Sequence, residues 1–224
     1  MKALILAPHP DDAEIAMGGT IQRMQASGTE VHVVVFTGEG ALQMVHSKET
    51  VLFAQRQQEQ VAALKCLGVP EVNIHWLNMA PASQFDRVQL SAGVIHLDRI
   101  LSEGFQALYV PMRSHNQDHN YVFDAAMAAT RPTKCDHTSV FLYEQPTQFH
   151  GEQMTNTLGG RYYISLHEQH MVKKRAAILC HQSQMKGREN SLAGVGGVDA
   201  LARLRGMEIG QPYAELFYLI RSVQ

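Results

Sequence analysis

Three features of the sequence predict an α/β protein whose mostly parallel sheet carries helices on both faces. Apolar, strand-like runs alternate with segments of helical spacing along the whole chain, which is typical of parallel strands joined by helical crossovers. Several helical segments end at a glycine or before a proline, as helices commonly do. Polar clusters follow two of the expected strands, and ligands of such sheets bind beyond the carboxyl ends of the strands.

Apolar runs and helical spacing define the elements of the first part of the chain. Continuous apolar runs predict buried strands over residues 3–7 and 31–36, the second of which, VHVVVF, is rich in β-branched valine. A segment with helical spacing follows each strand, over 18–28 and 48–67, and a glycine closes each of them. A third strand is expected at 72–77.

The same alternation continues through the rest of the chain. We expect a helix over 88–102, a strand over 107–111, and a helix over 121–130 that stops before a proline. The remaining expected elements are a strand at 140–143, helices at 168–185 and 199–207, and a strand at 216–220. Neither an internal repeat nor a linker rich in Pro, Gly or Ser divides the sequence, so we expect residues 1–224 to form a single domain.

The composition predicts a globular cytoplasmic protein. Of the 224 residues, 45% are hydrophobic, which is enough to fill a core. A net charge of -2 without any basic run argues against a nucleic-acid partner. No apolar stretch reaches the roughly 18 residues of a membrane span, and the first residues lack the pattern of a signal peptide. The three cysteines, Cys66, Cys135 and Cys180, are widely spaced, as reduced thiols of the cytoplasm are.

The stretch APHPDDAEIAMGG at residues 7–19 indicates a metal site. It places His9 and three carboxylates, Asp11, Asp12 and Glu14, within six positions directly after the first strand. Ionised carboxylates this close repel one another, and a cation relieves that repulsion. Histidine and aspartate are ligands that zinc accepts. The competing interpretation is a simple turn, because proline and aspartate are turn formers.

A second polar cluster, RSHNQDH at residues 113–119, follows the fourth strand and is expected at the same edge of the sheet. Zinc in hydrolases takes three protein ligands and keeps one position for water. His9, Asp12 and His119 complete such a set. Adjacent side chains usually point in different directions, so Asp12 can bind the metal while Asp11 acts as the base that accepts a proton from water.

The motifs of the chain resemble those of one known family. These are APHPDDAEIAMGG, the QDH that ends at residue 119, RQQEQVAALKCLG (56–68), KKRAAILCHQSQ (173–184) and YAELF (213–217). In this order they resemble the PIG-L/LmbE-like family of zinc-dependent N-acetylglucosaminyl deacetylases, which includes the mycothiol- and bacillithiol-pathway deacetylases. The resemblance implies a Rossmann-like three-layer sandwich, an acetamidosugar substrate and a homo-oligomer.

Carried over residue by residue, the resemblance implies Zn²⁺ on His9, Asp12 and His119, although another divalent metal is possible. It also implies that Asp11 is the general base and that Arg56 contacts the sugar substrate. The expected reaction is hydrolysis of an acetamide, with a side chain that helps to stabilise the oxyanion.

The chain departs from the family at one position of the second cluster. The family has a histidine three residues before the last zinc ligand, where this chain has Asn116. The nearest histidine, His115, lies one residue earlier. We expect His115 to act as the catalytic side chain and Asn116 to bind substrate. The alternative is that Asn116 polarises the carbonyl and that another group donates the proton.

Each of several polar residues in or near these motifs can have one of two roles. Asp118 either caps the following helix or supports a histidine ligand. Glu14 either forms a hydrogen bond near the metal or lies in the first turn of a helix, where its negative charge interacts favourably with the helix dipole. Arg56 and Glu59 form either a functional pair or only a surface ion pair. His181 has either a core or a substrate-binding role.

Three alternatives to deacetylation remain at this point. The same scaffold can hydrolyse another acyl group or an ester, and the related proteins include a metal-dependent hydratase. A nucleotide-binding domain without enzymatic activity is the third alternative, although the sequence lacks GxGxxG. Specificity is expected to depend on four loops, at residues 38–48, 79–86, 145–160 and 187–197.

Overall fold

The computed structural model describes residues 1–44, 47–135, 137–146, 160–188 and 191–223. Its centre is a seven-stranded sheet in the order β5-β2-β1-β6-β7-β9-β8. These strands are β1 (Lys2–Ala7), β2 (Glu30–Thr37), β5 (Ile74–Ala80), β6 (Ala107–Pro111), β7 (Ser139–Tyr143), β8 (Arg161–Leu166) and β9 (Tyr213–Arg221). Strands β5, β2, β1, β6 and β7 run parallel, whereas β9 is antiparallel to both of its neighbours.

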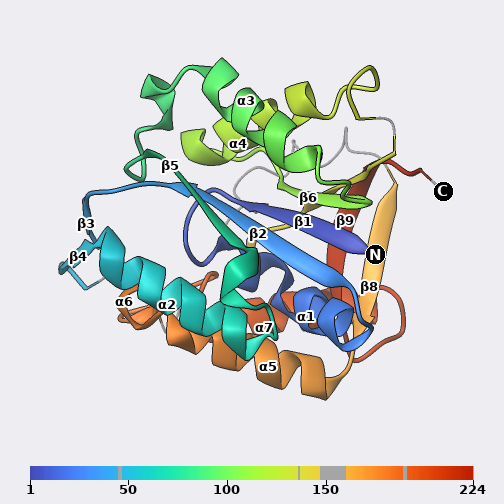
Figure 1. Ribbon diagram of the computed structural model, residues 1–224. Coiled ribbons are helices and arrows are strands. Elements are labelled where there is room, and N and C mark those ends of the chain that lie inside the picture. Colours follow the sequence, from blue (N-terminus) through green and yellow to red (C-terminus); the bar gives the residue numbers. More distant parts are fainter. Residues whose placement is uncertain (45–46, 136, 147–159, 189–190, 224) are drawn as a thin grey trace.

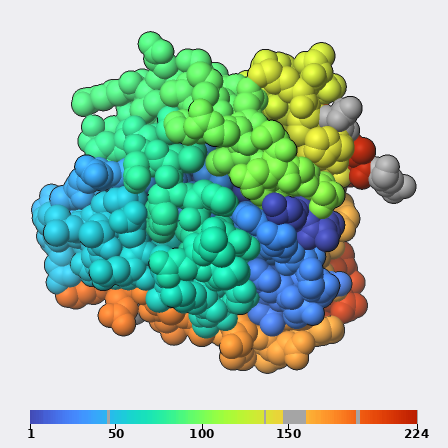
Figure 2. All heavy atoms as spheres, in the orientation of Figure 1, coloured from blue at the N-terminus to red at the C-terminus, as the bar shows by residue number. Residues whose placement is uncertain are grey.

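Helices cover both faces of this sheet, as Figure 1 shows. Helices α3 and α4 lie on one face, and α1, α2, α5 and α7 lie on the other. The bounds are α1 (Asp12–Ala26), α2 (Phe53–Cys66), α3 (Leu90–Leu101), α4 (Gln117–Ala129), α5 (Glu168–Cys180), α6 (Gln182–Met185) and α7 (Val195–Met207). Side chains of these layers cover most of the sheet in the view of Figure 2. The predicted α/β class with a mostly parallel sheet is therefore confirmed.

The central strand β1 shows why this sheet requires helices on both faces. Ala3, Ile5 and Ala7 pack into the core on one face, while Leu4 and Leu6 pack into the core on the other. Successive side chains of a strand point to opposite faces, so a continuous apolar run is buried on both. All five of these side chains are fully buried.

Helix α1 begins six residues earlier than the expected start at residue 18, and it contains a kink. Met17 leaves the helical region (φ -138°, ψ 26°), and the first part of the helix already starts at Asp12. Past the kink, Glu215 accepts hydrogen bonds from the backbone N–H groups of Gly19 (3.0 Å) and Thr20 (2.7 Å). Lys174 Nζ donates to the same carboxylate at 2.7 Å. The YAELF motif thus has a structural role, since its glutamate satisfies backbone donors that the kink exposes.

Other expected boundaries also differ from the structure. The helix expected over 48–67 begins at Phe53, because strand β4 (Thr50–Leu52) pairs with β3 (Ala41–Gln43) before it. Part of that expected segment, residues 45–46, lies outside the described residues. The helix expected over 168–185 is interrupted at His181 (φ -80°, ψ 58°), which separates α5 from α6.

The strand order brings the two polar clusters of the sequence together. Strand β1 pairs with β2 on one side and with β6 on the other. The chain therefore changes direction across the sheet between β1 and β6, which is the position where parallel α/β sheets bind ligands. None of the helices that the structure describes combines the length and the apolar character of a membrane span.

Candidate functional site

The loop after β1 holds Asp11 in an unusual backbone conformation. Asp11 has φ 105° and ψ -24°, a positive φ that L residues other than glycine adopt rarely. Gln60 of α2 stabilises this conformation, because its Oε1 accepts the Asp11 N–H at 2.8 Å. Arg56, one turn earlier on α2, donates to the carbonyl of Pro10 at 3.0 Å. Backbone strain of this kind persists where the surrounding structure enforces it, commonly at functional sites.

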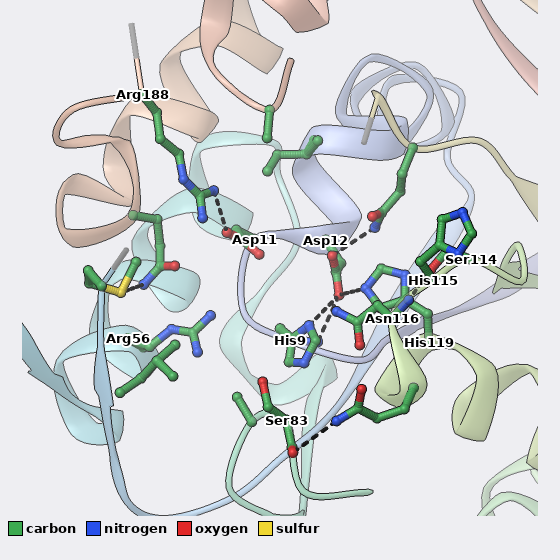
Figure 3. A pocket seen from close by; sticks show the side chains of 18 of the residues that line it. His9, Asp11, Asp12, Arg56, Ser83, Ser114, His115, Asn116, His119 and Arg188 are labelled. Atoms are coloured by element: carbon green, nitrogen blue, oxygen red, sulfur yellow. Dashed lines mark hydrogen bonds and ion pairs between the residues drawn. The ribbon is translucent and has the colours of Figure 1, made fainter. Parts of the chain in front are cut away.

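Three side chains converge at the end of β1, as Figure 3 shows. Asp12 Oδ2 lies 3.3 Å from His9 Nδ1 and 3.4 Å from His119 Nε2. One potential ligand atom from each residue lies within 4.8 Å of the others. Gln145, two residues beyond the end of β7, donates to the second oxygen of Asp12 at 2.7 Å. The structure thus brings together the three residues that the sequence predicts as a metal set.

Asp118 fixes the orientation of one of these imidazoles. His9 Nε2 lies 2.8 Å from Asp118 Oδ2, and the Asp118 carboxylate also accepts the backbone N–H groups of Ser83 and Phe85. A carboxylate has no proton to donate, so His9 Nε2 carries a proton toward Asp118, and Nδ1 is the ring nitrogen that faces Asp12. A carboxylate behind a histidine is a common arrangement at metal sites, because it sets the tautomer of the ligand.

The electrostatics of this cluster favour a positive charge among its members. Burial disfavours the charged form of His9, but hydrogen bonds to Asp118 and Asp12 outweigh it and raise the pKa of His9 to about 9. Burial likewise disfavours an ionised Asp12. The attraction of His119 and hydrogen bonds with both imidazoles outweigh that effect and hold the pKa of Asp12 well below its usual range. The donor set and its charge therefore fit a divalent cation such as zinc.

Asp11 has the opposite shift. Burial, followed by the negative charge of Asp12, raises the pKa of Asp11 above its ordinary value, while the charges of Arg56 and Arg188 partly oppose this rise. Asp11 lines the same cavity as the three converging side chains without being one of them. A carboxylate with a raised pKa has more affinity for a proton, which suits a general base.

The loop after β6 presents polar groups to the other side of the cavity. Asn116 is the N-cap of α4, because its Oδ1 accepts the Asp118 N–H at 2.9 Å. The capping role therefore belongs to Asn116, and Asp118 supports His9 instead. His115 is exposed and lines the cavity together with Asn116, so both remain available to a substrate.

A buried polar network lies beneath Asp11. Gln60 donates from Nε2 to Glu14 Oε1 at 2.5 Å, and Glu14 Oε2 lies 3.6 Å from His181 Nε2. All three side chains are fully buried. Glu14 thus acts by hydrogen bonding near the site, and His181 belongs to the core. Glu59 accepts from the Ser183 N–H (3.0 Å) and hydroxyl (2.6 Å), which fastens α2 to α6 rather than pairing with Arg56.

The cavity has a volume of about 660 Å³. Each of the four loops expected to set specificity contributes a described residue to its lining, namely Leu42, Ser83, Gln145 and Arg188. Of the loop at 145–160, residues 147–159 lie outside the described part of the chain.

Three contributors to the site were missed by sequence reasoning. Gln60 belongs to a motif segment but carries no signal that separates it from the neighbouring glutamines. Gln145 follows the end of the fifth expected strand, and this position at the same edge of the sheet was a usable signal. Arg188 lies in a glycine-rich loop far along the chain, where only the fold brings it to the cavity.

Comparison with known families gives one match that covers more than half of the chain. Residues 4–130 match the PIG-L family model, described as GlcNAc-PI de-N-acetylase. This range contains both loops that form the cluster of His9, Asp12 and His119.

Individual proteins similar to this chain include two sequences and one solved structure. The chain is 37% identical over 75 residues to the 1D-myo-inositol 2-acetamido-2-deoxy-alpha-D-glucopyranoside deacetylase of Rhodococcus jostii (strain RHA1), covering 30% of this chain but only 26% of that protein. It is 26% identical over 187 residues to the Uncharacterized deacetylase YaiS of Escherichia coli (strain K12), covering 80% of this chain and 90% of the relative. The zinc inhibited form of teicoplanin deacetylase Orf2 superposes with a TM-score of 0.76 at 16% identity, covering 98% and 97% of the two chains.

Proposed function

The chain belongs to the PIG-L family, and from this premise we propose that it is a zinc-dependent N-deacetylase of an N-acetylglucosamine-type small-molecule conjugate. The observation that carries the proposal is the convergence of His9, Asp12 and His119 beside a buried Asp11 in one cavity. The name of the Rhodococcus relative supports the substrate class, since that protein is a deacetylase of an acetamidosugar conjugate.

His9, Asp12 and His119 are the residues that would hold the metal. When bound, zinc supplies Lewis acidity, which polarises a carbonyl oxygen and lowers the pKa of water. Asp118 keeps the His9 Nδ1 lone pair directed to the cluster through its hydrogen bond at Nε2. Gln145 holds Asp12 from its other oxygen.

The neighbouring side chains carry the proton transfers. Asp11 accepts a proton from the attacking water, for which its raised pKa and its fixed backbone suit it. His115 donates a proton to the leaving amine, and the amide of Asn116 donates a hydrogen bond to the substrate. The Asn116 oxygen already caps α4, so only its N–H₂ group remains for this contact.

The experiment combines metal analysis with acetate release from a panel of acetamidosugar conjugates. Protein purified without chelator should contain about one zinc per chain and release acetate from at least one conjugate. Asp11→Asn should retain the zinc but lower kcat by roughly 100- to 10,000-fold, because the base is lost. The exposed Asp86 lies outside the cavity, so Asp86→Asn serves as the matched control and should leave kcat unchanged.

The other candidates give different results in the same experiment. A hydratase would add water to a substrate double bond without releasing acetate from any conjugate. A nucleotide-binding domain would contain no stoichiometric metal. A wild-type rate for Asp11→Asn would show that Asp11 is not the base.

A further inference from the structure

Glu144, the residue that follows β7, forms a buried ion pair that the proposed reaction does not use. Arg205 of α7 contacts both oxygens of its carboxylate, with Nε 2.9 Å from Oε2 and NH2 beside Oε1. Both side chains are buried, and NH1 of the arginine also donates to Glu208 at 2.6 Å. Paired hydrogen bonds between a guanidinium and a carboxylate fix the relative orientation of the two groups, so this contact is strongly directional.

The next residue, Gln145, contacts the cluster of proposed metal ligands. It is buried, lines the cavity, and donates from Nε2 to Asp12 Oδ1 at 2.7 Å. The other oxygen of Asp12 faces His9 Nδ1 at 3.3 Å and His119 Nε2 at 3.4 Å. The hydrogen bond from Gln145 therefore helps to fix the rotation of the Asp12 carboxylate and directs Oδ2 to the two imidazoles.

The segment that carries Gln145 is held by the side chain before it. Glu144 points to α7, whereas Gln145 points to Asp12 at the start of α1. The backbone N–H of Glu144 donates to the Leu216 carbonyl at 3.4 Å, which is long for a hydrogen bond. The ion pair with Arg205 is the shorter and more directional of these two contacts of Glu144.

Helix α7 is itself held close to the sheet beside Arg205. A Cβ atom on Gly206 would lie 2.5 Å from the Gln211 carbonyl oxygen and 2.7 Å from the backbone nitrogen of Tyr213, so a larger residue requires a backbone shift. Tyr213 begins β9, the neighbour of β7 in the sheet. The backbone of α7 therefore lies against the sheet next to the arginine, which limits how far the guanidinium can move from Glu144.

The charges of this region balance within the protein. Beside the first pair lies a second buried ion pair, in which Lys174 Nζ is 2.7 Å from Glu215 Oε1. Both pairs line one small cavity of about 10 Å³, which holds no more than roughly one water molecule. Neither pair therefore has room for a ligand, and the role of Arg205 and Glu144 is to be sought in what they hold in place.

We propose that Arg205 and Glu144 are positioning residues, which act through Gln145 to hold Asp12 in the orientation that binds the metal. The role of Asp12 as a metal ligand rests on the proposed function, whereas the series of contacts from α7 to Asp12 does not. Neither Arg205 nor Glu144 lines the cavity, so we expect neither to touch the substrate.

A narrower role for the ion pair is to fasten α7 to the sheet. Its loss would then lower the stability of the protein and leave the zinc affinity of the folded molecules unchanged. Replacing both partners by apolar residues separates the two roles, because it leaves no uncompensated buried charge and such replacements often preserve stability. The pair variant Arg205→Met/Glu144→Met is the variant of this kind.

The test is the zinc affinity of the full chain, measured by competition with a chelating dye. Gln145→Met should lower it by roughly 10- to 100-fold, the range for losing a partner of a metal ligand. The pair variant should lower it by roughly tenfold, because Gln145 is then less well fixed. Adding Gln145→Met to the pair variant should weaken zinc binding no further than Gln145→Met alone, since the ion pair acts through this glutamine.

The matched control is another arginine–carboxylate pair that fastens α7. Arg175 of α5 contacts Asp199 of α7, with Nε at 2.7 Å and NH2 at 2.9 Å from its two oxygens, and neither residue lines the cavity. Arg175→Met/Asp199→Met should leave the zinc affinity unchanged. Arg205→Lys keeps the charge but loses the paired N–H donors, so its zinc affinity should lie between those of the wild type and the pair variant. It decides the question if the pair variant does not fold.

Crystal structures of the metal-free variants test the same contacts without zinc. In the pair variant the distance from Gln145 Nε2 to Asp12 Oδ1 should exceed roughly 3.5 Å, the limit of a hydrogen bond. The control pair variant should keep it near the 2.7 Å of the unaltered chain. If the wild type binds no zinc, the proposed metal role is refuted, and these structures still decide whether the ion pair positions Gln145.

Three results would overturn the positioning role. One is wild-type zinc affinity in both the pair variant and Arg205→Lys, and another is an unchanged hydrogen bond from Gln145 to Asp12 in the structure of the pair variant. The third is a multiplication of the two losses when Gln145→Met is added, which would mean that the ion pair and Gln145 act independently. Zinc binding as expected, together with no acetate release from any conjugate, would refute the proposed deacetylation and leave the positioning role intact.

Discussion

The two loops that build the site are held in different ways. The loop after β1 is fixed by residues from other elements. Thr37 donates to the Pro8 carbonyl from its N–H (3.1 Å) and its hydroxyl (2.6 Å), Arg56 donates to Pro10, and Gln60 accepts from Asp11. Pro10, Asp11 and Asp12 are themselves buried.

The loop after β6 is held mainly by the start of its own helix. Ser114 and Asn120 form two hydrogen bonds with each other, at 3.0 and 2.9 Å. Asn116 caps α4 by accepting the Asp118 N–H. Its central residues, from His115 to Gln117, are exposed. A loop fixed by local contacts tolerates changes in its exposed side chains without disturbing the core.

The two ways of holding a loop suit two different requirements of the site, namely fixed positions for some side chains and variable contacts for others. The proposed metal ligands and base must be held at defined positions, and the buried loop after β1 meets this requirement through contacts from β2 and α2. Contacts to a substrate can vary, and we propose that the exposed part of the loop after β6 makes them. His119 lies on α4 beyond this exposed part and is buried, so it shares the environment of the first loop.

The largest expected effect comes from removing a proposed metal ligand that follows either loop. Asp12→Ala and His119→Ala should each lower zinc affinity by more than roughly 100-fold, since the loss of outer partners alone causes 10- to 100-fold changes. Zinc content after dialysis and competition with a chelating dye measure this. His96→Ala on α3, outside the cavity, is the control. Full zinc occupancy in either variant would remove that residue from the ligand set.

The sequence indicated the first loop directly, because its polar residues are close neighbours in the chain. His9, Asp11 and Asp12 stand within four positions directly after an unmistakable strand, so residue type and spacing were sufficient. To place His119 beside these residues, one further inference was needed, namely that the carboxyl ends of parallel strands lie at the same edge of the sheet. The pairing of β1 with β6 confirms that step.

Other features depend on contacts that no local pattern encodes. Aspartate and asparagine are both common helix caps, but in the structure Asn116 caps α4, whereas the Asp118 carboxylate contacts His9 and the backbone of Ser83 and Phe85. Strand β8 was missed because it lies at the sheet edge with its first two residues, Arg161 and Tyr162, exposed, so it lacks an apolar run. Helix α1 is kinked at Met17, and the N–H groups of Gly19 and Thr20 beyond the kink are accepted by Glu215, which lies about 200 positions later in the sequence.

An intermediate effect is expected in the exposed loop after β6. His115→Ala should lower kcat for acetate release by roughly 100-fold, the scale of losing an acid or an oxyanion donor, with zinc content unchanged. Asn116→Asp keeps a side-chain oxygen for the cap but removes the N–H₂ group, and it should mainly raise KM. A large loss of kcat in Asn116→Asp together with a wild-type rate for His115→Ala would assign the catalytic role to Asn116 instead.

The smallest effect should come from Gln60, whose hydrogen bond to the loop after β1 goes to the backbone of Asp11. Gln60→Met removes the acceptor of the Asp11 N–H and the donor to Glu14 at similar volume. Asp11 then loses the contact that holds its positive φ, so kcat should fall by roughly 10-fold while KM and zinc content stay close to wild type. Gln58→Met, an exposed position on the same helix, should leave all three quantities unchanged. If Gln60→Met instead loses zinc or raises KM with kcat intact, Gln60 supports the fold of the loop but does not position Asp11, and the rigidity of the first loop has another source.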